Sequence, residues 1–131
     1  MSEIASISFR DELIGWSQPL IVDQINHFYF DRLAGRSRLA CELAIQHYRI
    51  WRCVLRDDLD AAAELRGVLS DNARAEGLPA SLLDEADRAV LDELMDVIVS
   101  RFRRTPYIAR SYGMTLLDTA ANLARARQLH S

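Results

Sequence analysis

The sequence predicts a single-domain, all-α protein, and three observations indicate this fold class. Apolar residues recur at steps of three and four along most of the chain, which is the spacing of one buried helix face. The strong helix formers Ala, Leu, Arg and Glu dominate the composition. No segment alternates apolar and polar residues for long enough to form a strand. A chain of 131 residues is long enough to build one hydrophobic core without a metal or a disulfide.

Three helices are expected in the first half of the chain. The first spans residues 8–16, and the second spans residues 19–34, because Pro19 suits a first helical turn and Gly35 ends the apolar pattern. The third spans residues 37–55. The apolar face of each helix is marked by Phe9, Leu13 and Trp16, by Ile21, Ile25, Phe28 and Tyr29, and by Leu39, Leu43, Ile50, Trp51 and Val54, respectively.

A fourth helix is expected after a bend at Asp57 and Asp58. It spans residues 59–76, Gly77 is placed as its C-cap, and Pro79 prevents the helix from continuing. Its inward face carries Ala62, Leu65, Leu69 and Ala73.

Two long helices complete the chain. The fifth spans residues 82–103, with Ser81 as its N-cap and acidic residues in its first turn, where the helix dipole favours them. The sixth spans residues 106–128, with Thr105 as N-cap and Pro106 as first helical residue. Because almost nothing separates these two helices, they are expected to pack as an antiparallel hairpin. The expected architecture is one bundle of about six helices that spans the whole chain.

Charge and composition exclude several function classes. The net charge is −3 and the pI about 5.6, so binding to nucleic acid is not expected. All 16 basic residues are arginine, and without lysine neither a Schiff base nor a P-loop can form. No apolar run approaches the roughly 20 residues that cross a bilayer, and residues 1–4 do not resemble a secretory signal, so a cytoplasmic location is expected. Cys41 and Cys53 are expected to be buried apolar side chains rather than a disulfide.

No residue pattern predicts catalysis. The spacings of zinc sites, calcium loops and glycine-rich phosphate loops are absent. Cys41 and Cys53 each lie six residues from His47, which places them on different helix faces from the histidine. The carboxylates are spread over helix surfaces or lie at helix starts, and the arginines within residues 101–104 suit the negative end of a helix dipole. An enzyme is therefore not expected.

Three stretches of the chain resemble sensor globins, the haem domains found at the front of bacterial globin-coupled sensors. Residues 21–29 (Ile-Val-Asp-Gln-Ile-Asn-His-Phe-Tyr) resemble the family's B helix, whose closing Phe-Tyr pair places a tyrosine towards bound oxygen. Residues 46–51 (Gln-His-Tyr-Arg-Ile-Trp), followed by residues 58–62, resemble the E helix and the acidic turn after it. Residues 68–78, with Pro79 close behind, resemble the F helix and its Gly-Leu ending.

The resemblance covers residues 20–125 and implies a globin-like bundle whose last two helices correspond to G and H. It also contains one departure. The histidine that binds haem iron in the family stands four residues before the closing glycine, and counting back from Gly77 leads to Ala73. Alanine has no donor atom, so no haem is expected. Tyr29 keeps the position of the distal tyrosine, although a tyrosine on an apolar helix face is also a common core residue.

The resemblance places a pocket where the family holds haem. Its candidate lining residues are Phe28, Tyr29, His47, Trp51, Leu69 and Ala73. Because protein interiors are close-packed, the bulky members of this set are expected to close part of the space that a haem would occupy.

Three functions remain open at this point. The leading one is a haem-free, globin-like regulatory or sensor module that acts through ligand or partner binding. The second is a haem-binding gas sensor with His47 as an unusual axial ligand, which is the one case that would supply a cofactor. The third is a helical protein-interaction adaptor without a small-molecule ligand.

The resemblance further implies a homodimer through the last two helices, with any signalling output carried by a separate protein. Apolar residues of that hairpin exceed what one core stripe can bury, which points to the same surface. The interface candidates are Val90, Val97, Met114, Leu116 and Leu117. Neither nucleic acid nor a membrane is expected as a partner.

Overall fold

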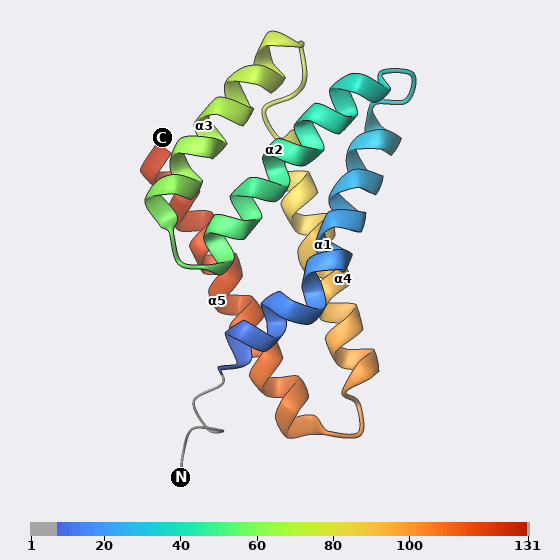
Figure 1. The fold of residues 1–131 in the computed structure, drawn as a ribbon, viewed down its shortest axis with the longest axis vertical. Coiled ribbons are helices and arrows are strands. Elements are labelled where there is room, and N and C mark those ends of the chain that lie inside the picture. Colours follow the sequence, from blue (N-terminus) through green and yellow to red (C-terminus); the bar gives the residue numbers. More distant parts are fainter. Residues whose placement is uncertain (1–7, 131) are drawn as a thin grey trace.

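A computed structural model describes residues 8–130, and these residues form five helices and no strand (Figure 1). The helices are α1 (Phe9–Arg32), α2 (Ser37–Leu55), α3 (Leu59–Ala75), α4 (Leu82–Arg101) and α5 (Pro106–His130). The all-α prediction is confirmed. Residues 1–4, on which the expectation about a secretory signal depends, lie outside the described part of the chain.

The first two expected helices are one helix, so the prediction of six was wrong. Helix α1 continues through Pro19, and the segment before Pro19 turns away from the axis of the rest (Figure 1). Proline has no backbone N–H and its ring crowds the preceding turn, which bends a helix and need not end it. Leu13 and Ile21, on either side of the bend, are both fully buried. Burial of both segments against the same core holds the bent helix together.

The other helix bounds agree with the predicted ones within two residues. The Gly77 C-cap is confirmed: its φ is +77°, Leu78 N–H bonds to the Ala73 carbonyl at 3.0 Å, and Gly77 N–H bonds to the Arg74 carbonyl at 2.9 Å. Ser81 is the N-cap residue of α4, as predicted. Its side chain makes no capping bond and instead lies 3.0 Å from a carboxylate oxygen of Glu85.

Asp57 occupies the equivalent turn between α2 and α3 in a left-handed conformation, with φ +61°. A residue with a side chain pays for this conformation with strain, so other contacts must hold it. One oxygen of the Asp57 carboxylate accepts a bond from Arg10 of α1, and the other accepts the side-chain N–H of Asn122 in α5 at 2.8 Å. The turn thereby ties α2 to both ends of the chain.

The helices pack as one connected body. Helix α1 contacts α2 and α4, α3 contacts α2 and α5, and α5 also contacts α4 and α1. Helices α4 and α5 run in opposite directions from the short turn that joins them (Figure 1), as the hairpin prediction required. The largest side chains with no more than 1% exposure are Tyr29, Trp51, Leu13, Ile21, Ile25, Leu43, Ile50, Leu69, Leu82, Leu94, Ile98 and His47.

Two expectations about burial require correction. Val90 and Leu116 were expected at a dimer interface but lie in the chain's own core, with 0% and 2% exposure. Each falls on the buried stripe of its helix, and periodicity alone cannot separate that stripe from an apolar stripe on the surface. Cys41 was expected to be buried but is exposed, and Cys53 is half-buried; both are free thiols.

Candidate functional site

Five polar or aromatic side chains meet in the interior and are named here the buried polar cluster: Tyr29, His47, Trp51, Arg66 and Asp87. They come from α1, α2, α3 and α4. The exposed fraction is 0% for the first three residues, 5% for Arg66 and 3% for Asp87. Burial of charge at this depth is rare unless the charges are paired and hydrogen-bonded.

Asp87 is the centre of the buried polar cluster. Its Oδ1 lies 2.7 Å from His47 Nε2 and accepts the Trp51 indole N–H at 2.9 Å. Its Oδ2 accepts a bond from the Arg66 guanidinium at 2.9 Å. Three donors from two other helices therefore converge on one carboxylate of α4.

The position of the protons on His47 follows from these partners. An ionised carboxylate can only accept, so the Nε2 facing Asp87 carries a hydrogen. In the neutral imidazole Nδ1 is then an acceptor, and the Tyr29 hydroxyl, 2.6 Å away, is the donor. Both ring nitrogens of His47 are thus engaged within the protein.

The cluster continues outwards through a second carboxylate, Asp84. Arg66 bonds to Asp84 at 2.6 Å, and Arg127 of α5 lies 3.1 Å from the same oxygen. Asp84 is half-buried, with 42% of its side chain exposed. With Arg127 included, the polar network joins all five helices.

The electrostatics keep Asp87 ionised. Burial alone would raise the pKa of this carboxyl, but the neighbouring His47 and Arg66 outweigh burial and hold the pKa below its usual value. Burial, together with the negative charge of Asp87, raises the pKa of the Tyr29 phenol, so Tyr29 remains a hydrogen-bond donor. The donors and acceptors of the buried polar cluster are all hydrogen-bonded, and these bonds fix the positions of α1, α2, α3 and α4 relative to one another.

The lowered pKa of Asp87 predicts a loss of stability in acid. Between the native pKa and the unfolded value of about 3.9, the unfolded chain binds more protons, so stability rises with pH in this window. The contribution is fully present above the unfolded pKa and is lost as the pH falls through the native one. We expect the midpoint of urea unfolding to be flat from pH 7 to about pH 5 and to fall steeply below about pH 4.

The matched control for this pH dependence is Glu85→Gln. Hydrogen bonds from Arg32 and Ser81 lower the pKa of Glu85 too, but 40% of this side chain is exposed and solvent screens its effect. The variant should keep most of the acid dependence. An acid dependence that disappears with Glu85→Gln would show that Asp87 is not its source.

The structure brings together only part of the predicted pocket lining. Tyr29, His47 and Trp51 belong to the buried polar cluster, and Leu69 and Ala73 are buried in the core with 0% and 3% exposure. Phe28 is half-buried: its ring contacts that of Tyr29 at 5.2 Å between centroids, and the Arg32 guanidinium lies over the Phe28 ring at 5.0 Å. Side chains of the protein itself therefore surround Tyr29 and His47.

Sequence reasoning missed Asp87 and Arg66, the two charged members of the cluster. Asp87 was treated as one of several acids near a helix start, and Arg66 was not singled out. Both stand at apolar stripe positions of their helices: Asp87 is four residues after Leu83 and three before Val90, and Arg66 is four after Ala62 and three before Leu69. A charge in register with a buried stripe was the available indication of a polar network inside the bundle.

Residues 8–130 contain neither a metal-binding cluster nor a membrane-spanning helix. No group of three or more His, Cys, Asp or Glu side chains there could hold a metal ion. No helix in this part of the chain is both long and apolar enough to cross a membrane. No family model, no curated protein and no solved structure matches the chain.

Proposed function

We propose that this protein is a haem-free, globin-like regulatory module that acts by binding a protein partner, with a second copy of itself as the first such partner. The single observation that carries the haem-free part is the engagement of His47. Its Nε2 is bonded to Asp87 and its Nδ1 to Tyr29, at 2.7 Å and 2.6 Å. To bind iron, the imidazole would have to give up one of these bonds inside the core.

The residue at position 73 supports the same proposal. Ala73 stands where the sensor globins carry their iron ligand, and it offers no donor atom. Leaving buried polar groups unpaired costs about 1–3 kcal/mol each, and more for charged groups. Freeing His47 for iron would leave Asp87 or Tyr29 without one buried hydrogen bond. Because Ala73 supplies no second iron ligand, haem binding would not offset this cost.

Haem titration tests the proposal directly. Adding haem to the purified protein should give no stoichiometric complex and no sharp Soret band, because only apolar contact with the porphyrin is left. The control is a histidine-ligated globin titrated under the same conditions. A one-to-one complex whose Soret band is lost in His47→Gln, with the helical circular dichroism of that variant retained, would establish the gas-sensor alternative instead.

The order of the helices supports the globin-like part of the proposal. The stretches that carry the resemblance lie on α1, α2 and α3, and the α4–α5 hairpin follows where the G and H helices are expected. The bend at Pro19 separates a short first segment of α1 from the segment that resembles the B helix.

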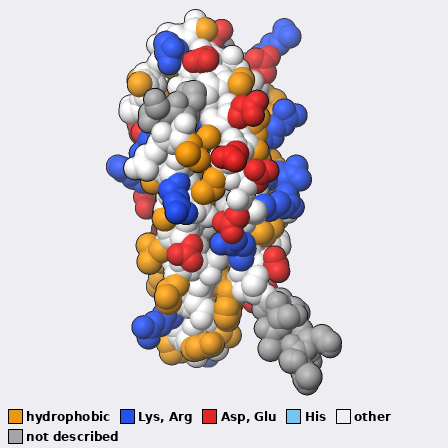
Figure 2. All heavy atoms as spheres, turned by 90° about the vertical axis from the view of Figure 1, so that its left-hand side faces the viewer, with side chains coloured by type: hydrophobic (Ala, Val, Ile, Leu, Met, Phe, Trp, Pro, Cys, Tyr) orange, Lys and Arg blue, Asp and Glu red, His pale blue; other side chains and the backbone are white. Residues whose placement is uncertain are grey.

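The surface of α5 supports binding through that helix. Tyr107, Met114 and Leu117 are 75%, 59% and 63% exposed, and their spacing of seven and three residues places them on one helix face. Exposed Ala121 and Ala124 continue the same spacing towards the C-terminus. Figure 2 shows hydrophobic side chains gathered along the lower part of the face on the side of α3 and α5. We name Tyr107, Met114, Leu117, Ala121 and Ala124 the α5 stripe.

The α5 stripe suits a symmetric dimer better than a small-molecule site. A helix with a seven-residue apolar repeat on its exposed side can meet its own copy through the same residues about a two-fold axis. Of the interface candidates, Met114 and Leu117 belong to this stripe, and Val97 on α4 is half-buried. Because the buried polar cluster fills the interior with protein side chains, partner binding is a better-supported mode of action than ligand sensing in a pocket.

A further inference from the structure

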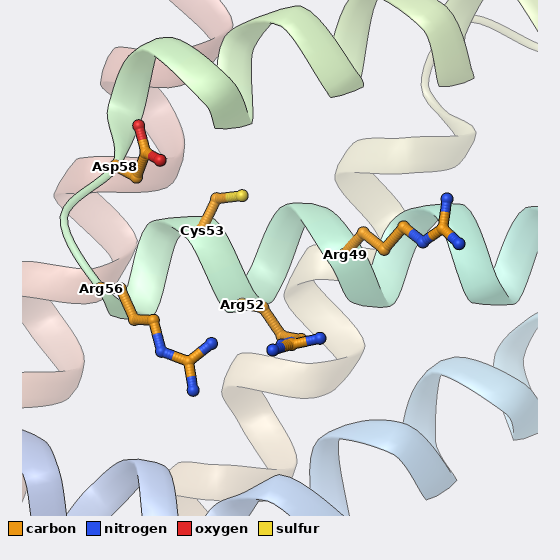
Figure 3. A pocket seen from close by; sticks show the side chains of 5 residues that line it. All are labelled: Arg49, Arg52, Cys53, Arg56 and Asp58. Atoms are coloured by element: carbon orange, nitrogen blue, oxygen red, sulfur yellow. The ribbon is translucent and has the colours of Figure 1, made fainter.

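We propose that α2 carries an anion site at Arg49, Arg52 and Arg56 that binds the phosphate group of a phosphate monoester. The site lies outside both the buried polar cluster and the α5 stripe, so this proposal is independent of the proposed function. The three arginines line a surface hollow of about 240 Å³ together with Cys53 and Asp58 (Figure 3). We call this space the arginine hollow.

The spacing of the arginines brings their side chains to one helix face. Arg49 and Arg52 are three residues apart, and Arg52 and Arg56 are four apart. On a helix, residues three and four apart are surface neighbours, and like charges in these positions repel one another. Figure 3 shows the Arg52 and Arg56 side chains on the same side of α2, with the Arg49 guanidinium further along the helix. The repulsion between these like charges on one helix destabilises it unless an anion neutralises them.

None of the three guanidinium groups is neutralised by a described residue. All three side chains are exposed, and the ion pairs among the described residues involve other arginines. The chain as a whole has more acidic than basic residues, so a shortage of carboxylates does not account for this. The helix dipole favours cations only within the last turn of α2, which leaves Arg49 without that explanation.

The other two residues of the hollow do not oppose an anion at the arginines. Burial raises the pKa of the Cys53 thiol, which keeps it uncharged near neutral pH. Asp58 caps α3 by accepting the Ala61 backbone N–H at 3.3 Å, and Figure 3 shows its carboxylate on the side of α3, away from the guanidinium groups of Arg52 and Arg56.

The hollow is large enough for a small ligand. A volume of about 240 Å³ accommodates several waters, at about 30 Å³ each in the liquid, and so accommodates a phosphate group with a small substituent. A neighbouring dent between α1 and α2, lined by Ile14, Ile21 and Leu55 among others, measures only about 10 Å³. It is too small for an acyl chain, so charge rather than apolar contact must supply the affinity. Arginine forks match phosphate oxygens in geometry as well as in charge.

The experiment is a titration of the protein with phenyl phosphate at constant ionic strength, followed by ¹⁵N NMR of the arginine side chains and by the melting temperature. Wild type should show saturable shifts at the arginine hollow and a rise in Tm, whereas sodium acetate at the same ionic strength should produce neither. The variant Arg52→Gln with Arg56→Gln should bind phenyl phosphate roughly tenfold more weakly for each arginine removed.

The matched control is Arg88→Gln with Arg125→Gln, which removes the same charge from two exposed arginines, one on α4 and one on α5, that do not line the arginine hollow. It should bind phenyl phosphate as wild type does. Equal weakening in both double variants would overturn the proposal, because the effect would then be one of net charge. So would unchanged phosphate affinity in Arg52→Gln with Arg56→Gln accompanied by a lower Tm without ligand, because the arginines would then only stabilise the end of α2.

A further titration, with a short phosphoserine peptide and its unphosphorylated form, distinguishes a phosphorylated side chain from a small phosphate ester as the ligand. Binding of the phosphopeptide that is at least tenfold tighter than that of phenyl phosphate assigns the site to a phosphorylated side chain. Equal or weaker binding assigns it to a small phosphate ester. Binding of the unphosphorylated peptide with the same affinity would overturn the proposal.

Discussion

Replacing Asp87 by alanine should destabilise the fold by about 3–5 kcal/mol, which is the usual cost of removing one partner from a buried ion pair. The carboxylate accepts bonds from His47, Trp51 and Arg66, and all three donors are at most 5% exposed. Its removal leaves the Arg66 charge without its buried counter-ion and leaves two N–H groups without an acceptor. The measurement is the free energy of unfolding from urea denaturation.

Asp84→Ala is the matched control for this prediction. Asp84 also bonds to Arg66, but it is half-exposed and water can replace it, so the loss should stay near 1 kcal/mol or below. A double variant, Asp87→Leu with Arg66→Met, should recover part of the stability because it removes both buried charges together. A loss for Asp87→Ala no larger than that for Asp84→Ala would contradict the central role assigned to Asp87.

Arginine substitutions at two adjacent residues of α5 should have opposite consequences. Leu116 is 2% exposed, so Leu116→Arg places an unpaired charge in the core and should unfold the protein. Leu117 is 63% exposed and belongs to the α5 stripe. Leu117→Arg should keep its helical circular dichroism and its Tm within a few degrees, but should shift the protein from dimer to monomer.

Sedimentation equilibrium of wild type and Leu117→Arg measures this difference, and circular dichroism separates unfolding from dissociation. Asp118→Ala, which changes an exposed charge of α5 at a position outside the α5 stripe, serves as the control and should remain a dimer. A wild-type protein that sediments as a monomer at all practical concentrations would end the proposal of a symmetric dimer through the α5 stripe. A Leu116→Arg variant that is folded and monomeric would show that Leu116 lies at the dimer interface and not in the core.

Much of the secondary structure was predictable because its causes are local. Helix α3 ends at Ala75 because Gly77 adopts a positive φ and Pro79 follows two residues later. The bounds of α2 were predicted correctly, at residues 37–55. The continuity of α1 through Pro19 was not predicted. Whether a proline ends or bends a helix depends on what both flanking segments bury.

The candidate site was predictable only in part. Tyr29, His47 and Trp51 were selected as neighbours through the resemblance to sensor globins, and the structure does bring them together. Asp87 was overlooked because a carboxylate near a helix start has an ordinary explanation in the helix dipole. Its burial becomes visible only when α4 packs against α2 and places the carboxylate beside three donors.

The sequence by itself determined the all-α class and four of the five helices with nearly correct bounds, because these depend on residue identity and on periodicity within one segment. The tertiary structure alone decided which apolar stripe of α4 and α5 faces inwards, so that Val90 and Leu116 are core residues while Met114 and Leu117 remain exposed. It also decided that both nitrogens of His47 are used by Tyr29 and Asp87. These outcomes depend on contacts between residues 18 to 40 positions apart, and a pattern within one helix carries no information about which other helix will cover it.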